Sequence, residues 1–155
     1  MTAPVVVFAV GNPSRGDDAI GPECHGQLEK WLKNENLGEH VELIEDFQLN
    51  IEHALDLQGR QLAIFIDAGE NTPAPFEFRQ IFRSTVASHS THALPPESVL
   101  QVYWQMEGRE PPTAFLLCVR GENFELGAEL SAAVQERLPG AIEAVQQAIQ
   151  RTVAA

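Results

Sequence analysis

The chain has little that could crosslink it and no segment that could anchor it in a membrane. Its 155 residues include two cysteines, Cys24 and Cys118, without Cys-x-x-Cys spacing. Both fall in apolar patterns, which predicts buried free thiols in a reducing compartment. No apolar run approaches the ~20 residues that cross a bilayer. The N-terminus lacks the basic segment and cleavage site of a signal peptide. We therefore expect a cytoplasmic protein.

Positive charge is also scarce. Ten Lys and Arg residues stand against 22 Asp and Glu residues, so the formal net charge is −12. Such a chain is repelled by phosphate backbones and anionic lipids, which argues against nucleic acid and membrane surfaces as partners. A basic or metal-bearing partner fits this charge better. The acidity also favours a soluble monomer.

Several catalytic motifs are missing. The glycine-rich segment at residues 11–21 is neither GxGxxG nor a P-loop, because no Lys-Ser/Thr follows its glycines. HExxH and GxSxG are absent. The apolar surroundings of the two cysteines are unfavourable for an activated thiolate. A nucleotide-binding domain rests only on the glycine-rich segment, whose adjacent acids would repel phosphates.

Segments with strand-like and helix-like hydrophobic patterns alternate along the chain. This alternation predicts one α/β domain over residues 1–155. The expected fold is a three-layer α/β/α arrangement with a mostly parallel, twisted sheet of about five strands and one antiparallel edge strand. Expected strands span residues 5–10, 41–44, 62–66, 76–82 (a half-buried or edge strand) and 114–119. Helices are expected after residue 18, from 49 or 50 to 57, after Pro95-Pro96, and from about residue 130, where Pro139-Gly140 should divide the last into two.

Three groups of polar residues lie where an expected strand meets the next element of the chain. Asp17 and Asp18 follow the first strand, Asp67 ends the third, and His89 and His92 lie before the helix at Pro95-Pro96. In open parallel sheets, ligands bind beyond the carboxyl ends of the strands. Each residue also has a simpler explanation: helix capping for one of the two acids, a turn for Asp67, and a solvated loop for either histidine. His25, His40 and His53 look like surface or helix-face residues.

Two carboxylates and one imidazole would form an incomplete coordination shell. Three protein ligands with open positions are typical of a catalytic divalent ion. Mixed oxygen and imidazole ligands suit zinc, nickel or similar ions. The residues alone therefore favour a metal-dependent hydrolase, without deciding which acid or which histidine takes part.

Residues 11–21, Gly-Asn-Pro-Ser-Arg-Gly-Asp-Asp-Ala-Ile-Gly, resemble the opening motif of the hydrogenase maturation endopeptidases. These enzymes remove a C-terminal peptide from the large-subunit precursor of nickel-iron hydrogenases. Asp67-Ala68 and Ser90-Thr91-His92 follow in the order that the family shows, so the resemblance covers essentially the whole chain. Residues 45–49 depart from the Asp-Gly-Gly-Thr of many members and look like the branch that serves cytoplasmic, bidirectional NAD(P)-linked hydrogenases. This segment is expected to help choose the precursor.

The resemblance implies that Asp18, Asp67 and His92 are the catalytic and metal-contacting residues. The first position is often Glu in relatives, and Asp18 has a shorter reach. The metal would be nickel already placed in the precursor, with zinc or cadmium as possible substitutes in vitro. Asp17 and Arg15 could support the site, although a surface pair between them or helix capping fits equally well. A non-catalytic nickel-sensing chaperone on the same scaffold is the alternative function.

Overall fold

The computed structural model describes residues 2–84 and 94–154. In this part of the chain a five-stranded sheet has the order β2-β1-β3-β5-β4. Its strands are β1 (Val5–Val10), β2 (Val41–Asp46), β3 (Leu62–Gly69), β4 (Phe76–Ile81) and β5 (Thr113–Arg120). Four strands are parallel, and β4 pairs antiparallel with β5 at one edge. The predicted mostly parallel sheet with an antiparallel edge strand is confirmed.

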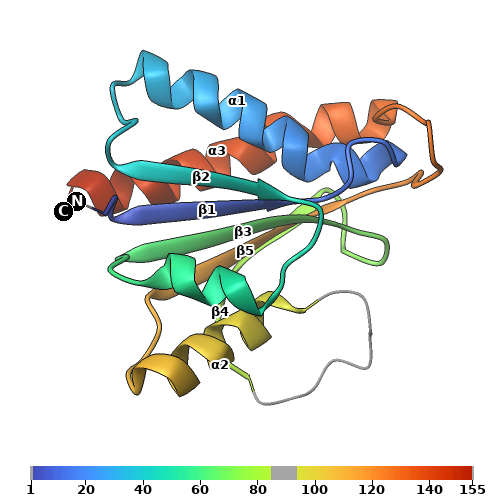
Figure 1. Ribbon diagram of the computed structural model, residues 1–155. Coiled ribbons are helices and arrows are strands. Elements are labelled where there is room, and N and C mark those ends of the chain that lie inside the picture. Colours follow the sequence, from blue (N-terminus) through green and yellow to red (C-terminus); the bar gives the residue numbers. More distant parts are fainter. Residues whose placement is uncertain (1, 85–93, 155) are drawn as a thin grey trace.

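Helices cover both faces of this sheet. The α-helices are α1 (Ile20–Asn34), α2 (Pro96–Glu107) and α3 (Ala132–Ala154), and two short 3-10 helices are η1 (Gly16–Ala19) and η2 (Ile51–Leu57). Figure 1 shows α1 and α3 on one face, with α2 and η2 on the other. The three-layer arrangement is therefore also confirmed. Among the described residues, no helix has the length and apolar character to cross a membrane.

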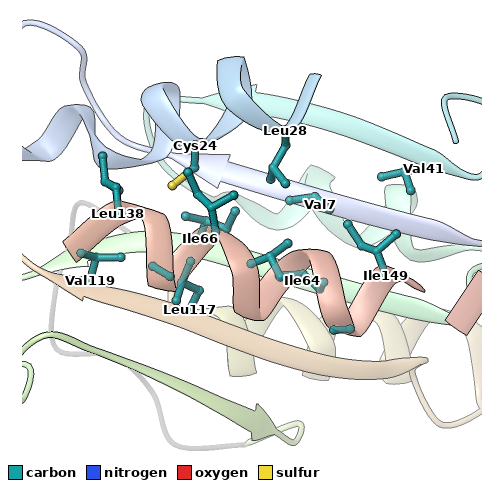
Figure 2. Close-up of a cluster of buried hydrophobic side chains, with 14 of the residues drawn as sticks. Val7, Cys24, Leu28, Val41, Ile64, Ile66, Leu117, Val119, Leu138 and Ile149 are labelled. Atoms are coloured by element: carbon teal, nitrogen blue, oxygen red, sulfur yellow. The ribbon is translucent and has the colours of Figure 1, made fainter. Parts of the chain in front are cut away.

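Buried apolar residues form one cluster on each face of the sheet, between the sheet and the helices that cover that face. Alternate residues of a strand point to opposite faces. Val7 and Ile64 belong to the cluster under α1 and α3, which Figure 2 shows, whereas Phe8 and Phe65 belong to the cluster under η2 and α2. The same alternation places Asp67 on the η2 and α2 face.

The last helix differs from its prediction. α3 begins at Ala132 and continues through Pro139 instead of breaking there. A proline in a helix interior removes one hydrogen bond and costs about 3 kcal/mol. Here Pro139 is exposed, while Leu138 and Ile142 on either side are buried in one cluster. Burial of one continuous apolar face against the sheet outweighs the local cost of the proline.

Candidate functional site at the carboxyl end of the sheet

The loop between β1 and α1 turns back over the end of β1. The Gly11 amide donates to the carbonyl of Asp46 at 3.0 Å, which ties the loop to β2. Gly11 has a φ of 150°, and a Cβ at this position would lie 2.0 Å from the Asp18 carbonyl oxygen. Only glycine permits this approach. The half-buried Asp18 accepts a hydrogen bond from the Asn12 amide through Oδ2 at 2.7 Å, so its carboxylate faces the start of the loop.

Asp17 has a different role from its neighbour. Its side chain is fully buried and accepts four hydrogen bonds from the segment between β5 and α3. The donors are the amides of Glu122 (2.7 Å), Asn123 (3.0 Å) and Ser131 (2.7 Å), and the Ser131 hydroxyl (2.8 Å). Burial raises the pKa of Asp17, but these hydrogen bonds outweigh it and hold the pKa below its ordinary value of 3.8.

The two simpler explanations for the acid pair are therefore wrong. Neither η1 nor α1 has a side-chain cap at its N-terminus, so neither carboxylate caps a helix. Asp17 is buried and cannot form a surface pair with the exposed Arg15. Its contact with a segment more than a hundred residues away has no local sequence signal. Asp17 instead anchors the loop that carries Asp18.

Asp67 lies at the end of β3 and is half-buried. Its Oδ1 accepts a hydrogen bond from the amide of Ala68 at 2.8 Å. The pKa of Asp67 is raised to about 7: burial is the largest cause, the Ala68 hydrogen bond opposes it, and the nearby charge of Asp18 adds to it. The structure thus brings two of the three predicted site residues, Asp18 and Asp67, within electrostatic reach of each other.

No basic side chain neutralises this pair in the part of the chain that the structure describes. The ion pairs found there do not include Asp18 or Asp67. The nearby charge of Asp18 disfavours ionisation of Asp67, and a bound cation would favour it. Asp67 can therefore hold a proton, or face a positive ion together with Asp18.

The predicted imidazole ligand cannot be placed. His92, and His89 beside it, lie outside the described residues. Within residues 2–84 and 94–154, no group of three or more His, Cys, Asp or Glu side chains could hold a metal ion. A metal site built from described residues alone is thus not present, and the set of Asp18, Asp67 and His92 stays a prediction.

His53 lies in η2 near this edge, and of the two predicted environments, surface or helix face, only the helix face holds. Its side chain is 5% exposed, and its ring lies edge-on to Phe8. Its Nδ1 accepts from the Asn50 amide at 2.9 Å, and its Nε2 lies 3.4 Å from Asp46 Oδ2. The sequence feature that could have indicated this burial is the capping box of η2, in which Asn50 also accepts a hydrogen bond from the Glu52 amide. His53 thereby holds the turn after β2.

The cysteines agree with their prediction in part. Both are free; Cys24 is buried, but Cys118 is only half-buried. Cys118 lies beside Asp67 in the sheet, and its sulfur is 2.9 Å from the hydroxyl oxygen of Thr72. Burial raises the pKa of Cys118, and it raises that of Cys24 to about 12. Neither thiol is activated as a nucleophile.

Comparison with known proteins supports the fold and leaves the sequence without a match. No family model and no curated protein matches the chain in sequence. Among solved structures, the hydrogenase maturating endopeptidase HybD from E. coli is similar with a TM-score of 0.75 and 23% identity, over 96% of this chain and 93% of that one.

Two archaeal structures are also similar. The [NiFe] hydrogenase maturation protease HycI from Thermococcus kodakarensis KOD1 has a TM-score of 0.68 and 24% identity, over 96% of this chain and 93% of that one. The hydrogenase 2 maturation peptidase from Thaumarchaeota archaeon SCGC_AB-539-E09 has a TM-score of 0.67 and 23% identity, over 94% and 97%. The chain therefore has, over nearly its whole length, the α/β fold of these solved hydrogenase maturation proteases.

Proposed function

We propose that this chain is an endopeptidase that removes the C-terminal extension of a nickel-loaded hydrogenase large-subunit precursor. The observation that carries the proposal is the pairing of Asp18 and Asp67 at the carboxyl end of a sheet with the maturation-protease fold. These carboxylates have no basic partner among the described residues, so they favour a cation that arrives with the substrate. The opening motif at residues 11–21 supports the same assignment.

Asp18 and Asp67 would recognise the metal-loaded precursor through its metal ion. The hydrogen bond from the Asn12 amide to Asp18, and the one from the Gly11 amide to Asp46 of β2, hold Asp18 over the end of β1. Asp67 has a pKa of about 7, so both its protonated and its ionised forms are populated at neutral pH. A divalent ion near both carboxylates stabilises their ionised forms. We propose His92 as the third contact to the precursor's nickel, which would serve as the recognition element that brings the scissile bond to the site.

The test is a processing assay with purified chain and nickel-loaded precursor. The wild-type chain is expected to remove the C-terminal extension, as measured by mass spectrometry, from nickel-loaded precursor but not from nickel-free precursor. Asp18→Ala, Asp67→Ala and His92→Ala are expected to abolish processing. Glu70→Ala, an exposed acid just beyond β3, is the matched control and should process normally.

Two outcomes would contradict the proposal. Retained cleavage in any two of the three site variants would remove the proposed site. Stable binding of the nickel-loaded precursor by wild type, without any loss of mass, would instead support the non-catalytic nickel-sensing chaperone. The same purified proteins answer both questions, because binding can be followed by size-exclusion chromatography before the mass is measured.

A further inference from the structure

The segment between β5 and α3, residues 121–131, presents an exposed leucine from a fixed backbone. Leu126 is 69% exposed. The residues on either side of it are held: the Glu125 amide donates to Asn123 Oδ1 at 3.0 Å, and the Gly127 amide donates to the Ser14 carbonyl at 2.7 Å. A backbone held in this way loses little freedom when a partner covers the leucine, which favours binding.

This segment is also joined to the loop that carries Asp18. The Gly16 amide donates to the Ala128 carbonyl at 3.1 Å, and the Asp17 amide donates to the Asn123 carbonyl at 2.7 Å. The Asp17 carboxylate adds its bonds to both ends of the segment. In Figure 1 the β5–α3 connection and the β1–α1 loop lie side by side at the same end of the sheet. A protein that brings a peptide bond to Asp18 would therefore meet Leu126 as well.

Acidic residues lie on both sides of the exposed leucine in the sequence of this segment. Glu125 and Glu129 are exposed, and neither forms an ion pair within the described residues. Glu122 differs because Arg120 and Arg137 neutralise it. Arg15 of the neighbouring loop is exposed and does not pair with these acids in the described structure. An apolar side chain inside an acidic rim matches a partner with an apolar pocket and Lys or Arg at its margin.

We propose that Leu126, with Glu125 and Glu129, is a docking point for the folded body of the protein substrate, at a basic-rimmed apolar pocket of that substrate. This inference rests on the proposed function, since it takes the precursor as the occupant. A second copy of this chain is a poor occupant, because a net charge of −12 on each copy and the same acidic rim would repel it.

The experiment compares Leu126→Ser with the matched control Phe82→Ser. Phe82 is 68% exposed and follows β4 at the opposite end of the sheet, where Ile81 pairs with Ala114 at the start of β5. Cleavage of nickel-loaded precursor is measured for KM and kcat, and precursor binding by calorimetry. Leu126→Ser is expected to raise KM and Kd about tenfold with kcat unchanged, the order that loss of one buried leucine produces. Phe82→Ser should change neither.

A charge-reversed double variant, Glu125→Lys with Glu129→Lys, tests the rim. It is expected to weaken binding most at low salt and to reduce the salt dependence of Kd. Circular dichroism and thermal unfolding of all variants should match wild type, because the hydrogen bonds that hold the segment do not use the side chains of Glu125, Leu126 or Glu129. Sedimentation of the wild-type chain should show a monomer.

The outcomes separate this inference from the proposed function. Wild type that binds the precursor without cleaving it contradicts the proposed function, and the binding data still decide the docking point. Wild type that cleaves, with Leu126→Ser within twofold of it, overturns the docking point alone. Equal weakening by Phe82→Ser, or self-association of wild type that Leu126→Ser abolishes, also overturns it. Wild type that neither binds nor cleaves the precursor overturns both.

Discussion

Two acids at the same end of the sheet, the buried Asp17 and the half-buried Asp67, have opposite environments. Asp17 accepts four hydrogen bonds from one distant segment, and its pKa lies below 3.8. Asp67 accepts a hydrogen bond only from its neighbour Ala68 among the described residues, lies near Asp18, and has a pKa of about 7. The fold supplies donors to the first acid and leaves the charge of the second without compensation. An acid of the first kind stabilises the structure, whereas one of the second kind is available to a ligand.

The largest expected effect on stability is that of substituting Asp17. In Asp17→Ala, the amides of Glu122, Asn123 and Ser131 lose their acceptor, and each buried donor without a partner costs about 1–3 kcal/mol. We expect the free energy of unfolding to fall by about 3–5 kcal/mol in urea denaturation. Asp18→Ala, which frees only the Asn12 amide, is the control and should cost about 1 kcal/mol. Equal losses in the two variants would contradict the comparison.

Asp67 is expected to show the opposite dependence on charge. Its folded pKa of about 7 lies above the ordinary 3.8, so the folded chain holds this proton more tightly than the unfolded chain does. The associated stability is present below about pH 4 and is lost as pH rises through about 7. In chelator-treated protein at pH 8, Asp67→Asn should therefore be more stable than wild type by roughly 2–4 kcal/mol.

The control for this prediction is the same variant at acid pH. Near pH 4 Asp67→Asn and wild type should unfold at similar urea concentrations, because the carboxyl group is then protonated. A difference between them that does not change from pH 4 to pH 8 would show that the Asp67 environment does not disfavour its charge.

The smallest expected effect comes from Ser131. Ser131→Ala removes the hydroxyl that donates to Asp17 and accepts from the Val134 amide at 3.3 Å, and keeps the three backbone donors to Asp17. We expect a loss of about 1 kcal/mol in thermal or urea unfolding. Ser98→Ala in α2 is a matched control. A loss as large as that of Asp17→Ala would mean that the hydroxyl, and not the set of four bonds, holds the junction.

Much of the fold was predictable because the hydrophobic pattern of a short segment indicates whether it forms a buried strand, an edge strand or a helix. β1 has six consecutive buried residues, and its predicted bounds are confirmed. The alternating pattern of β4 predicted a half-buried or edge strand; β4 is the antiparallel edge strand, and it ends at Ile81 rather than Phe82. The prediction failed at Pro139, where the local preference against a helix was outweighed by packing of α3 on the sheet. A single-residue propensity cannot represent that tertiary gain.

The sequence by itself determined the alternation of elements, the net acidity, and the positions of Asp67 at the end of one strand and of Asp18 in the loop after another, because strand and turn preferences depend on neighbouring residues. Only the tertiary structure decided what each acid does. Asp17 and Asp18 are adjacent and chemically identical, yet the donors that bury Asp17 come from residues 122–131, and the charge near Asp67 comes from a loop on another strand. Protonation and hydrogen bonding depend on distances in space, and chain order does not contain those distances.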